Sequence, residues 1–286
     1  MSDTNTTVFD TISQSYYELT AAERKVADYA LKNRDRSQYL SIGELAEESG
    51  VAEATVSRFC RRLGYKGYNA FKLAIANAGA VKLDADSPDR PIRDSDDPIE
   101  LARKLYAVES EAMLQTLNLL RPAELDRAVA ILRSARKVLC MGQGGSMILA
   151  SEAAHLFSVC DGKFFPVSDS HMQVIAAATL TAEDAVLFFS YSGATRDMME
   201  TLTVVHEQGA KIILITRFPR SPGAALADVV LQCGSNENPL QHGSVPARIA
   251  QLFLLDILFA RVTLSEPDAC RRNRQRIAQV LAEKHL

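Results

Sequence analysis

Hydrophobic positions in the first 80 residues recur at the spacing of amphipathic helices. Apolar side chains behind Thr20 fall three and four positions apart, and further short helical stretches follow. Two stretches open on a hydroxyl residue with a glutamate three positions later, Thr20-Ala-Ala-Glu23 and Ser41-Ile-Gly-Glu44, the pattern of a capping box. No convincing strand pattern occurs before residue 130. We therefore expect an all-α domain over residues 1–78.

The pattern changes after residue 99. A long amphipathic helix is expected over residues 99–119, and beyond it short apolar runs alternate with helical stretches. The runs predicted as strands are Val138–Met141, Phe164–Val167, Ala185–Ser190, Lys211–Thr216 and Val229–Leu231. Continuous apolar runs between helices are typical of a doubly wound α/β domain with a parallel sheet. This domain is expected to span residues 99–286.

Residues 79–98 differ from both neighbouring segments. They contain three prolines and six aspartates: Pro88, Pro91, Pro98, Asp84, Asp86, Asp89, Asp94, Asp96 and Asp97. Such a segment cannot bury apolar surface and resists helix formation. We interpret it as an acidic linker between the two domains.

The composition excludes several classes of protein. The chain has 286 residues, of which 47% are hydrophobic and 23% charged, so it is too apolar to be disordered. It has no apolar run of about 18 residues and no signal-peptide pattern, which predicts a cytoplasmic protein without a membrane partner. The five cysteines are odd in number and widely spaced, which indicates neither a disulfide framework nor a metal cluster. No metal or cofactor is expected.

Residues 42–63 fit a helix-turn-helix. Two short helices would meet at the turn Ser49-Gly50-Val51, with apolar side chains before and after it forming a shared core. The residues expected to face outward are Thr55, Ser57, Arg58, Arg61 and Arg62. Short hydroxyls near the start of the second helix suit base edges, and arginines suit phosphates or guanine. Double-stranded DNA is therefore the predicted partner of this domain.

The local charge supports DNA binding although the whole chain has a net charge of −3. Residues 54–83 contain no acid and six bases: Arg58, Arg61, Arg62, Lys66, Lys72 and Lys82. A basic patch of this kind is the electrostatic footprint of a DNA-binding surface, and Lys66 is added to the predicted contacts. The alternative is a helical bundle with a solvated basic face.

Two loops of the second domain have the composition of phosphate-binding turns. One follows the first predicted strand, Gly142-Gln-Gly-Gly-Ser146, and its Gly144 and Gly145 let backbone amides approach an anion. It matches neither the dinucleotide fingerprint nor the Walker pattern. The other, Ser190-Tyr-Ser-Gly-Ala-Thr195, combines three hydroxyls with Gly193. The alternative is that Ser192 or Thr195 only caps the following helix.

With both constellations in view, the chain resembles RpiR-type transcriptional regulators, in which a helix-turn-helix domain precedes a sugar isomerase (SIS) domain that senses a phosphorylated sugar. The resemblance is strongest over residues 19–26, 41–46 and 54–68, in both loops above, and over residues 209–216, 221–228 and 248–256. The sequence departs from the family pattern at Ala52 and Ala247, where serine is usual.

The resemblance implies a SIS-like five-stranded parallel sheet flanked by helices. It also implies that Ser146, Ser190, Ser192 and Thr195 hold the sugar phosphate, and that Glu237 faces the sugar. A homodimer through the SIS domain is expected, with a tetramer left open. The expected function is regulation of carbohydrate metabolism genes, with operator binding modulated by the sugar phosphate.

The alternative function is a sugar phosphate isomerase with an appended helical domain. Its catalytic base would have to be Glu237, His155 or His171. Asp169 and Gln173 could line the same pocket. None of these residues has a spacing that indicates catalysis, and an isomerase has no need of the basic window. We therefore predict a regulator without catalytic residues.

Overall fold

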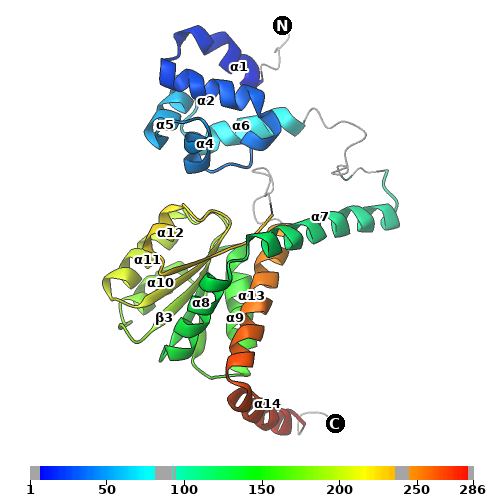
Figure 1. The fold of residues 1–286 in the computed structure, drawn as a ribbon, viewed down its shortest axis with the longest axis vertical. Coiled ribbons are helices and arrows are strands. Elements are labelled where there is room, and N and C mark those ends of the chain that lie inside the picture. The colour runs from blue at the N-terminus through cyan, green and yellow to red at the C-terminus, as the bar shows by residue number, and fades with distance from the viewer. Residues whose placement is uncertain (1–6, 81–91, 93–94, 236–244, 283–286) are drawn as a thin grey trace. The chain divides into compact units, whose positions relative to one another are not determined.

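The computed structural model describes residues 7–80, 92, 95–235 and 245–282, and it divides into two compact units (Figure 1). A helical unit precedes an α/β unit. Helix α7 (Pro98–Leu119) leads into the α/β unit, to which it belongs from Glu109 onward.

The helical unit consists of short helices around one core. Its elements are α1 (Val8–Ser15), a 3-10 turn (Tyr16–Glu18), α2 (Ala21–Lys32), α3 (Arg34–Ser37), α4 (Ile42–Glu48), α5 (Glu53–Arg62) and α6 (Tyr68–Ala80). Both predicted capping boxes are present, at the starts of α2 and α4. A third, from Thr7 to Asp10, opens α1. The core centres on Phe59 and Phe71, whose rings meet edge to face at 5.4 Å.

Helices α4 and α5 form the predicted helix-turn-helix. Leu45, Val56 and Phe59 are fully buried, and Val51 packs against them from the turn. The turn needs Gly50, whose φ is +64°, and the amide of Val51 donates to the carbonyl of Ala46 at 2.8 Å. Ala52 occupies the N-cap position of helix α5 and makes no side-chain capping bond, so the loss of the usual serine is not compensated.

Glu23 ties the start of α2 to the end of α5. Its carboxylate accepts from the amide of Thr20 at 2.9 Å and lies 3.2 Å from Nε of Arg62. Burial alone would raise the pKa of the Glu23 carboxyl, but the bonds from Thr20 and the charge of Arg62 outweigh burial and lower it. The contribution of Glu23 to stability is therefore present above its unfolded-state pKa and is lost as pH falls through its folded-state pKa.

We expect Glu23→Gln to lower the free energy of unfolding by about 1 kcal/mol at pH 7. The difference from the wild type should shrink as pH falls through the lowered folded-state pKa of Glu23, because the wild-type carboxylate then becomes protonated and loses its charge. Urea unfolding of both proteins at a series of pH values measures this difference in the free energy of unfolding. A difference that is constant with pH would contradict the role given to the carboxylate charge.

The α/β unit is built on a five-stranded parallel sheet, as predicted. Its strands are β1 (Val138–Gly142), β2 (Phe164–Val167), β3 (Ala185–Phe189), β4 (Lys211–Thr216) and β5 (Val229–Gln232), in the order β2-β1-β3-β4-β5. The helices after α7 are α8 (Pro122–Ser134), α9 (Gly145–Ser158), α10 (Ser170–Ala177), α11 (Arg196–Glu207), α12 (Pro222–Leu226), α13 (Val245–Ser265) and α14 (Pro267–Ala282). Each predicted strand matches an observed one to within one residue at either end.

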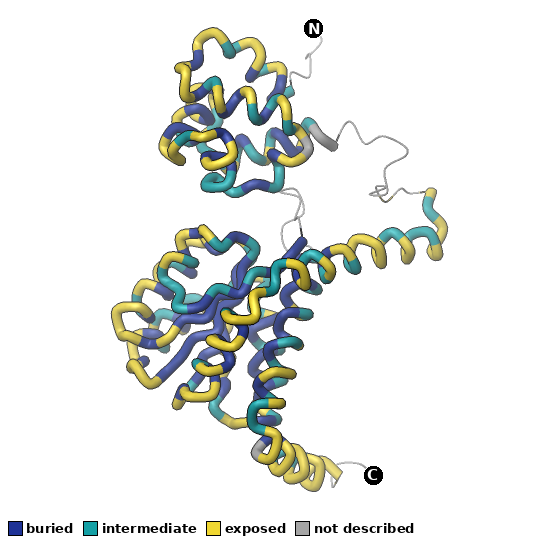
Figure 2. Tube along the Cα trace, in the orientation of Figure 1, coloured by how far each residue is buried: buried dark blue, intermediate teal, exposed yellow. Residues whose placement is uncertain are grey.

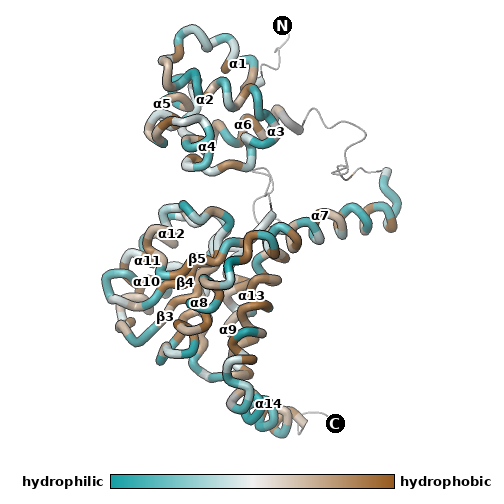
Figure 3. The backbone as a smooth tube through the Cα atoms, viewed as in Figure 1, coloured by the Kyte–Doolittle hydropathy of each residue, from teal (hydrophilic) through white to brown (hydrophobic). Residues whose placement is uncertain are grey.

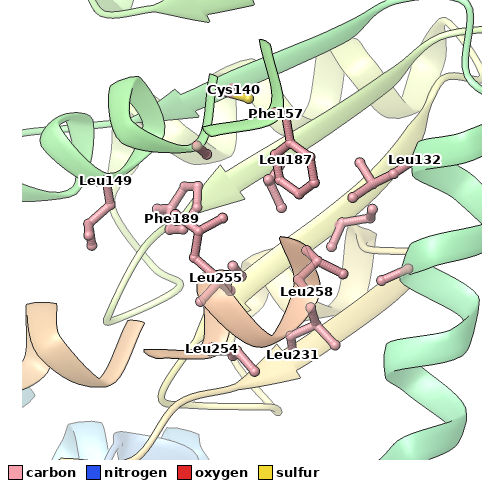
Figure 4. Close-up of a cluster of buried hydrophobic side chains, with 14 of the residues drawn as sticks. Leu132, Cys140, Leu149, Phe157, Leu187, Phe189, Leu231, Leu254, Leu255 and Leu258 are labelled. Carbon is pink, nitrogen blue, oxygen red and sulfur yellow. The ribbon is translucent and has the colours of Figure 1, made fainter. Parts of the chain in front are cut away.

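Helices cover both faces of the sheet. Along β1, Val138 and Cys140 belong to a core shared with α8, α9 and α13 (Figure 4), whereas Leu139 and Met141 belong to a core shared with α10, α11 and α12. The central strands β1 and β3 are therefore buried from end to end, which is why they are continuously apolar in sequence (Figures 2 and 3). Helix α14, in contrast, is largely exposed (Figure 2).

The helices that border the predicted linker reach into it from both sides. Helix α6 continues to Ala80, and α7 begins at Pro98. Asp97 is the cap of α7, because its Oδ1 accepts from the amides of Ile99 and Glu100 at 2.8 and 2.9 Å. Most of the predicted linker, residues 81–91, 93 and 94, lies outside the described residues.

The described helices include none that is long and apolar enough to cross a membrane. Within the same residues, no group of histidines, cysteines and acids has the arrangement of a metal site. All five cysteines are buried free thiols.

Candidate functional sites

The two predicted phosphate loops lie next to each other at the carboxyl ends of β1 and β3. The chain goes from β1 to its neighbour β2 and then crosses to β3 on the other side of β1, so the strand order reverses between β1 and β3. Open α/β sheets bind ligands at such a switch point, outside the carboxyl ends of the strands. The register pairs Gly142 with Phe189, the last residues of β1 and β3. The loops that follow therefore begin side by side.

The first loop is a tight turn from β1 into α9. A Cβ added to Gly142 would lie 2.5 Å from the carbonyl oxygen of Ser146, so only glycine fits at that position. Gly144 has a φ of +56°, which also favours glycine. Ser146 is the second residue of α9 and is half-buried. The turn therefore places Gly145 and Ser146 at the positive end of a 14-residue helix.

The second loop leaves hydroxyl groups available for a ligand. Ser190 is 6% exposed and its Oγ accepts from the amide of Gly193 at 3.1 Å, while Oγ of Ser192 accepts from Ala194 at 3.3 Å. Both hydroxyls still have a hydrogen to donate. Thr195 occupies the cap position of α11 but makes no side-chain capping bond. The alternative that these hydroxyls only cap a helix thus does not hold for Thr195.

Gly193 is held in place by the neighbouring strand and helix. Its φ is +60°, and its carbonyl accepts from the amide of Gly223 at 2.9 Å. An added Cβ would collide with the side chain of Ser221 and would stand 3.0 Å from Oγ1 of Thr216. Thr216 in turn donates to the carbonyl of Tyr191 at 3.0 Å. These contacts with β4 and with the start of α12 hold the loop in place.

We expect Gly193→Ala to lower the free energy of unfolding by about 1–3 kcal/mol, because it adds both backbone strain and a steric clash. Thermal unfolding of the full chain measures the loss. Gly162→Ala is the matched control, since a Cβ at Gly162 meets open space and its φ is not positive. Equal stability of the two variants would show that the loop adjusts without cost.

The other predicted pocket residues are placed differently. Glu237 lies outside the described residues; Ser235, just before that segment, accepts from the hydroxyl of Tyr191 at 3.0 Å. His171 is exposed near the start of α10. His155 is in the last turn of α9, nine residues after Ser146 and therefore about 14 Å away along the helix. The structure does not bring His155 to the phosphate loops.

Three further polar side chains lie close to the first loop. Gln173, which the sequence indicated as a pocket residue, is completely buried and donates to the carbonyls of Gly142 and Val167 at 2.9 and 2.8 Å. Gln143 and Arg248 were not predicted as ligand contacts. The sequence signal for Gln143 is that its amide side chain stands within the glycine-rich loop. The signal for Arg248 is that it begins residues 248–256, one of the stretches that resemble the family.

The predicted DNA-contacting residues are mostly exposed on or beside α5. Arg58, Arg61 and Lys66 are exposed, and Ser57 is half-buried. The expectation that Thr55 faces outward is wrong, because it is only 7% exposed. Thr55 is four residues before Phe59 and shares its buried helix face. Its Oγ1 accepts from Nη2 of Arg58 at 3.0 Å, which orients that arginine.

Arg62 already has partners within the helical unit. Its Nε lies 3.2 Å from the carboxylate of Glu23, and its Nη1 donates to the carbonyl of Glu18 at 3.1 Å. Its side chain is 46% exposed. Contact of Arg62 with DNA stays a prediction, but its interactions in the structure join α5 to α2.

Comparisons with known proteins agree with this architecture. Residues 6–82 match a family model described as "Helix-turn-helix domain, rpiR family", and residues 131–261 match the SIS domain. An HTH-type transcriptional regulator of Haemophilus influenzae is 32% identical over 281 residues, covering 98% of each chain. The HTH-type transcriptional regulator HexR of Pseudomonas aeruginosa is 32% identical over 247 residues, covering 86% of each.

Solved structures show the same fold. The NanR protein of Vibrio vulnificus, in complex with ManNAc-6P, has a TM-score of 0.85 and 24% identity, covering 97% of this chain and 99% of its own. The sugar isomerase domain of an RpiR transcription factor from Sphaerobacter thermophilus has a TM-score of 0.58 and 22% identity, covering 63% of this chain and 99% of its own. The helical N-terminal region and the SIS-like parallel sheet are thus confirmed.

Proposed function

The chain belongs to the RpiR family of helix-turn-helix transcriptional regulators, and we propose that a phosphorylated sugar controls its binding to operator DNA. Relatives that match almost the whole chain are named as transcriptional regulators, so the isomerase alternative is not favoured. The residues proposed to contact DNA are Ser57, Arg58, Arg61, Arg62 and Lys66, and the buried Thr55 orients Arg58.

One observation carries the proposal of a phosphorylated sugar. Two loops at the switch point begin side by side, and the second presents Ser190, Ser192 and Thr195, the last with a hydroxyl that α11 does not use. Neutral donors at a helix N-terminus suit a phosphate without a metal. The similar NanR structure contains ManNAc-6P, which supports the same class of ligand for this chain. Ser146, Gly144, Gly145 and Gly193 complete the proposed site, and Glu237 is proposed to face the sugar.

We also propose that the regulator acts as a homodimer through its α/β unit, in the cytoplasm, on genes of carbohydrate metabolism. Large apolar side chains remain exposed on α7 and α13, among them Leu117 at 52% and Leu252 at 40%. Burying such side chains favours association of a second copy. A dimer would present two copies of α5 to half-sites about one helical turn apart.

The experiment that tests the proposal is fluorescence anisotropy of the full chain on labelled DNA from upstream of its own gene. Titrations at fixed salt are made with and without glucose 6-phosphate, glucosamine 6-phosphate and ManNAc-6P. We expect specific binding whose affinity changes at least 5-fold with one of them, the lower end of typical allosteric coupling. Specific binding that none of them changes would contradict control by these sugar phosphates.

A further inference from the structure

Unsatisfied polar atoms gather at the carboxyl end of β1. In the described part of the chain, seven buried side-chain nitrogen and oxygen atoms have no hydrogen-bond partner. Four of these belong to three residues at this end: Nε2 and Oε1 of Gln143, Oε1 of Gln173 and Nε of Arg248. Buried polar groups are almost always hydrogen-bonded, so such a concentration indicates that a polar partner completes the site.

Gln143 lies directly beside the second loop, residues 190–195, which we call the hydroxyl loop. It follows Gly142, and Ser190 follows Phe189, the register partner of Gly142 on the adjacent strand. Gln173 fixes the backbone just before Gln143, because its amide nitrogen donates to the carbonyls of Gly142 and Val167. The amide of Gln143 is therefore presented by a rigid turn, with a donor and an acceptor both unused.

Arg248 approaches the same loop from another element. It is the fourth residue of α13, and its Cδ lies 3.8 Å from the position that a Cβ on Gly145 would take. The arginine stem therefore lies beside the first turn of α9. An arginine has only donors, and it lies here at the positive end of a helix. Oxygen acceptors are therefore the groups that this corner would bind.

We propose that Gln143 and Arg248 bind the sugar part of the effector and determine which phosphorylated sugar is recognised. The inference rests on the proposed function, in which the Ser190–Thr195 loop holds the phosphate. The amide of Gln143 suits a ligand group that both donates and accepts, such as a hydroxyl, and Arg248 suits an acceptor oxygen of the sugar. Gln173 is a positioning residue that keeps Gln143 in place.

The test compares the variants Gln143→Leu and Arg248→Met with the wild-type full chain by isothermal titration calorimetry. The probes are glucose 6-phosphate, glucosamine 6-phosphate, ManNAc-6P and, as a competitor, inorganic phosphate. Each variant is expected to bind the preferred sugar phosphate about 10-fold more weakly, the effect of one lost hydrogen bond to a ligand. Competition by inorganic phosphate should stay within about 2-fold of the wild type, because the hydroxyl loop is intact.

Stability without ligand separates binding from a structural role. Replacing a buried, unsatisfied amide with leucine should leave the unfolding temperature of the free protein unchanged or raise it. Arg248→Lys keeps the charge but not the planar fork, so it should recover only part of the affinity. Gln275→Leu and Arg271→Met on the exposed surface of α14 are the matched controls, expected to bind as the wild type.

Several outcomes would overturn the inference. These are unchanged affinity for the sugar phosphates in both variants, an equal loss for inorganic phosphate, a lower unfolding temperature of the free variants, or dissociation of an oligomer in sedimentation. The last would show that a second copy covers these atoms. If the wild type binds none of the sugar phosphates, this inference and the proposed effector fail together. If Ser192→Ala with Thr195→Ala binds normally while these variants do not, only the assignment of the phosphate loop fails.

Discussion

A protein carrying Ser192→Ala and Thr195→Ala is expected to lose its response to sugar phosphates while binding DNA as tightly as the wild type. A hydrogen bond to a charged group contributes about 1.5–3 kcal/mol, so two lost bonds to the phosphate weaken binding by roughly 10²- to 10⁴-fold. The residues proposed to bind DNA lie in the separate helical unit, so the change should not affect them.

Calorimetry with the preferred sugar phosphate measures the loss, and anisotropy on the operator measures the response. Ser134→Ala with Thr203→Ala is the matched control, because both hydroxyls are exposed and bond only to carbonyls within their own helices. An effector response equal to that of the wild type would remove the phosphate role from this loop. Loss of DNA binding together with the response would indicate that the double substitution disturbs more than the ligand site.

The elements that the sequence predicted well are those that depend on neighbouring residues. The capping boxes at Thr20 and Ser41 are contained in four residues each, and the strands are apolar because both faces of the sheet are covered. The two loops proposed to bind phosphate could also be located in the sequence, because glycines and hydroxyls right after a strand are a local signal. Their meeting at one point follows from the strand order, which the sequence did not predict.

The features that the sequence did not predict depend on residues far apart in the chain. Gln143 and Arg248 are 105 positions apart, and only the packing of α13 against α9 places both at the glycine loop. The ion pair of Arg62 with Glu23 spans 39 positions. Thr55 was placed on the wrong face because helical spacing alone does not show how wide the buried face of α5 is. Here both α2 and α6 pack against that helix.

The second large effect is a loss of affinity for operator DNA, which we expect when Arg58→Ala and Arg61→Ala are combined in α5. Both side chains are exposed, and the hydroxyl of Thr55 orients Arg58. If each arginine contacts a phosphate, the slope of log affinity against log salt falls by about 0.9 per contact, or about 2 per bound copy and twice that for a dimer. The affinity for operator DNA should fall roughly 100-fold at physiological salt.

Anisotropy titrations at several salt concentrations measure both quantities. Arg271→Ala with Arg272→Ala is the matched control, since it removes the same charge from exposed positions on α14 and leaves α5 unchanged. A steep loss of affinity without a change of slope would mean that the arginines read bases rather than phosphates. An unchanged slope and affinity would mean that α5 is not the DNA-contacting helix.

Arg62→Ala should differ from both double variants, because the loss of its contacts with Glu23 and Glu18 should show first as reduced stability of the helical unit.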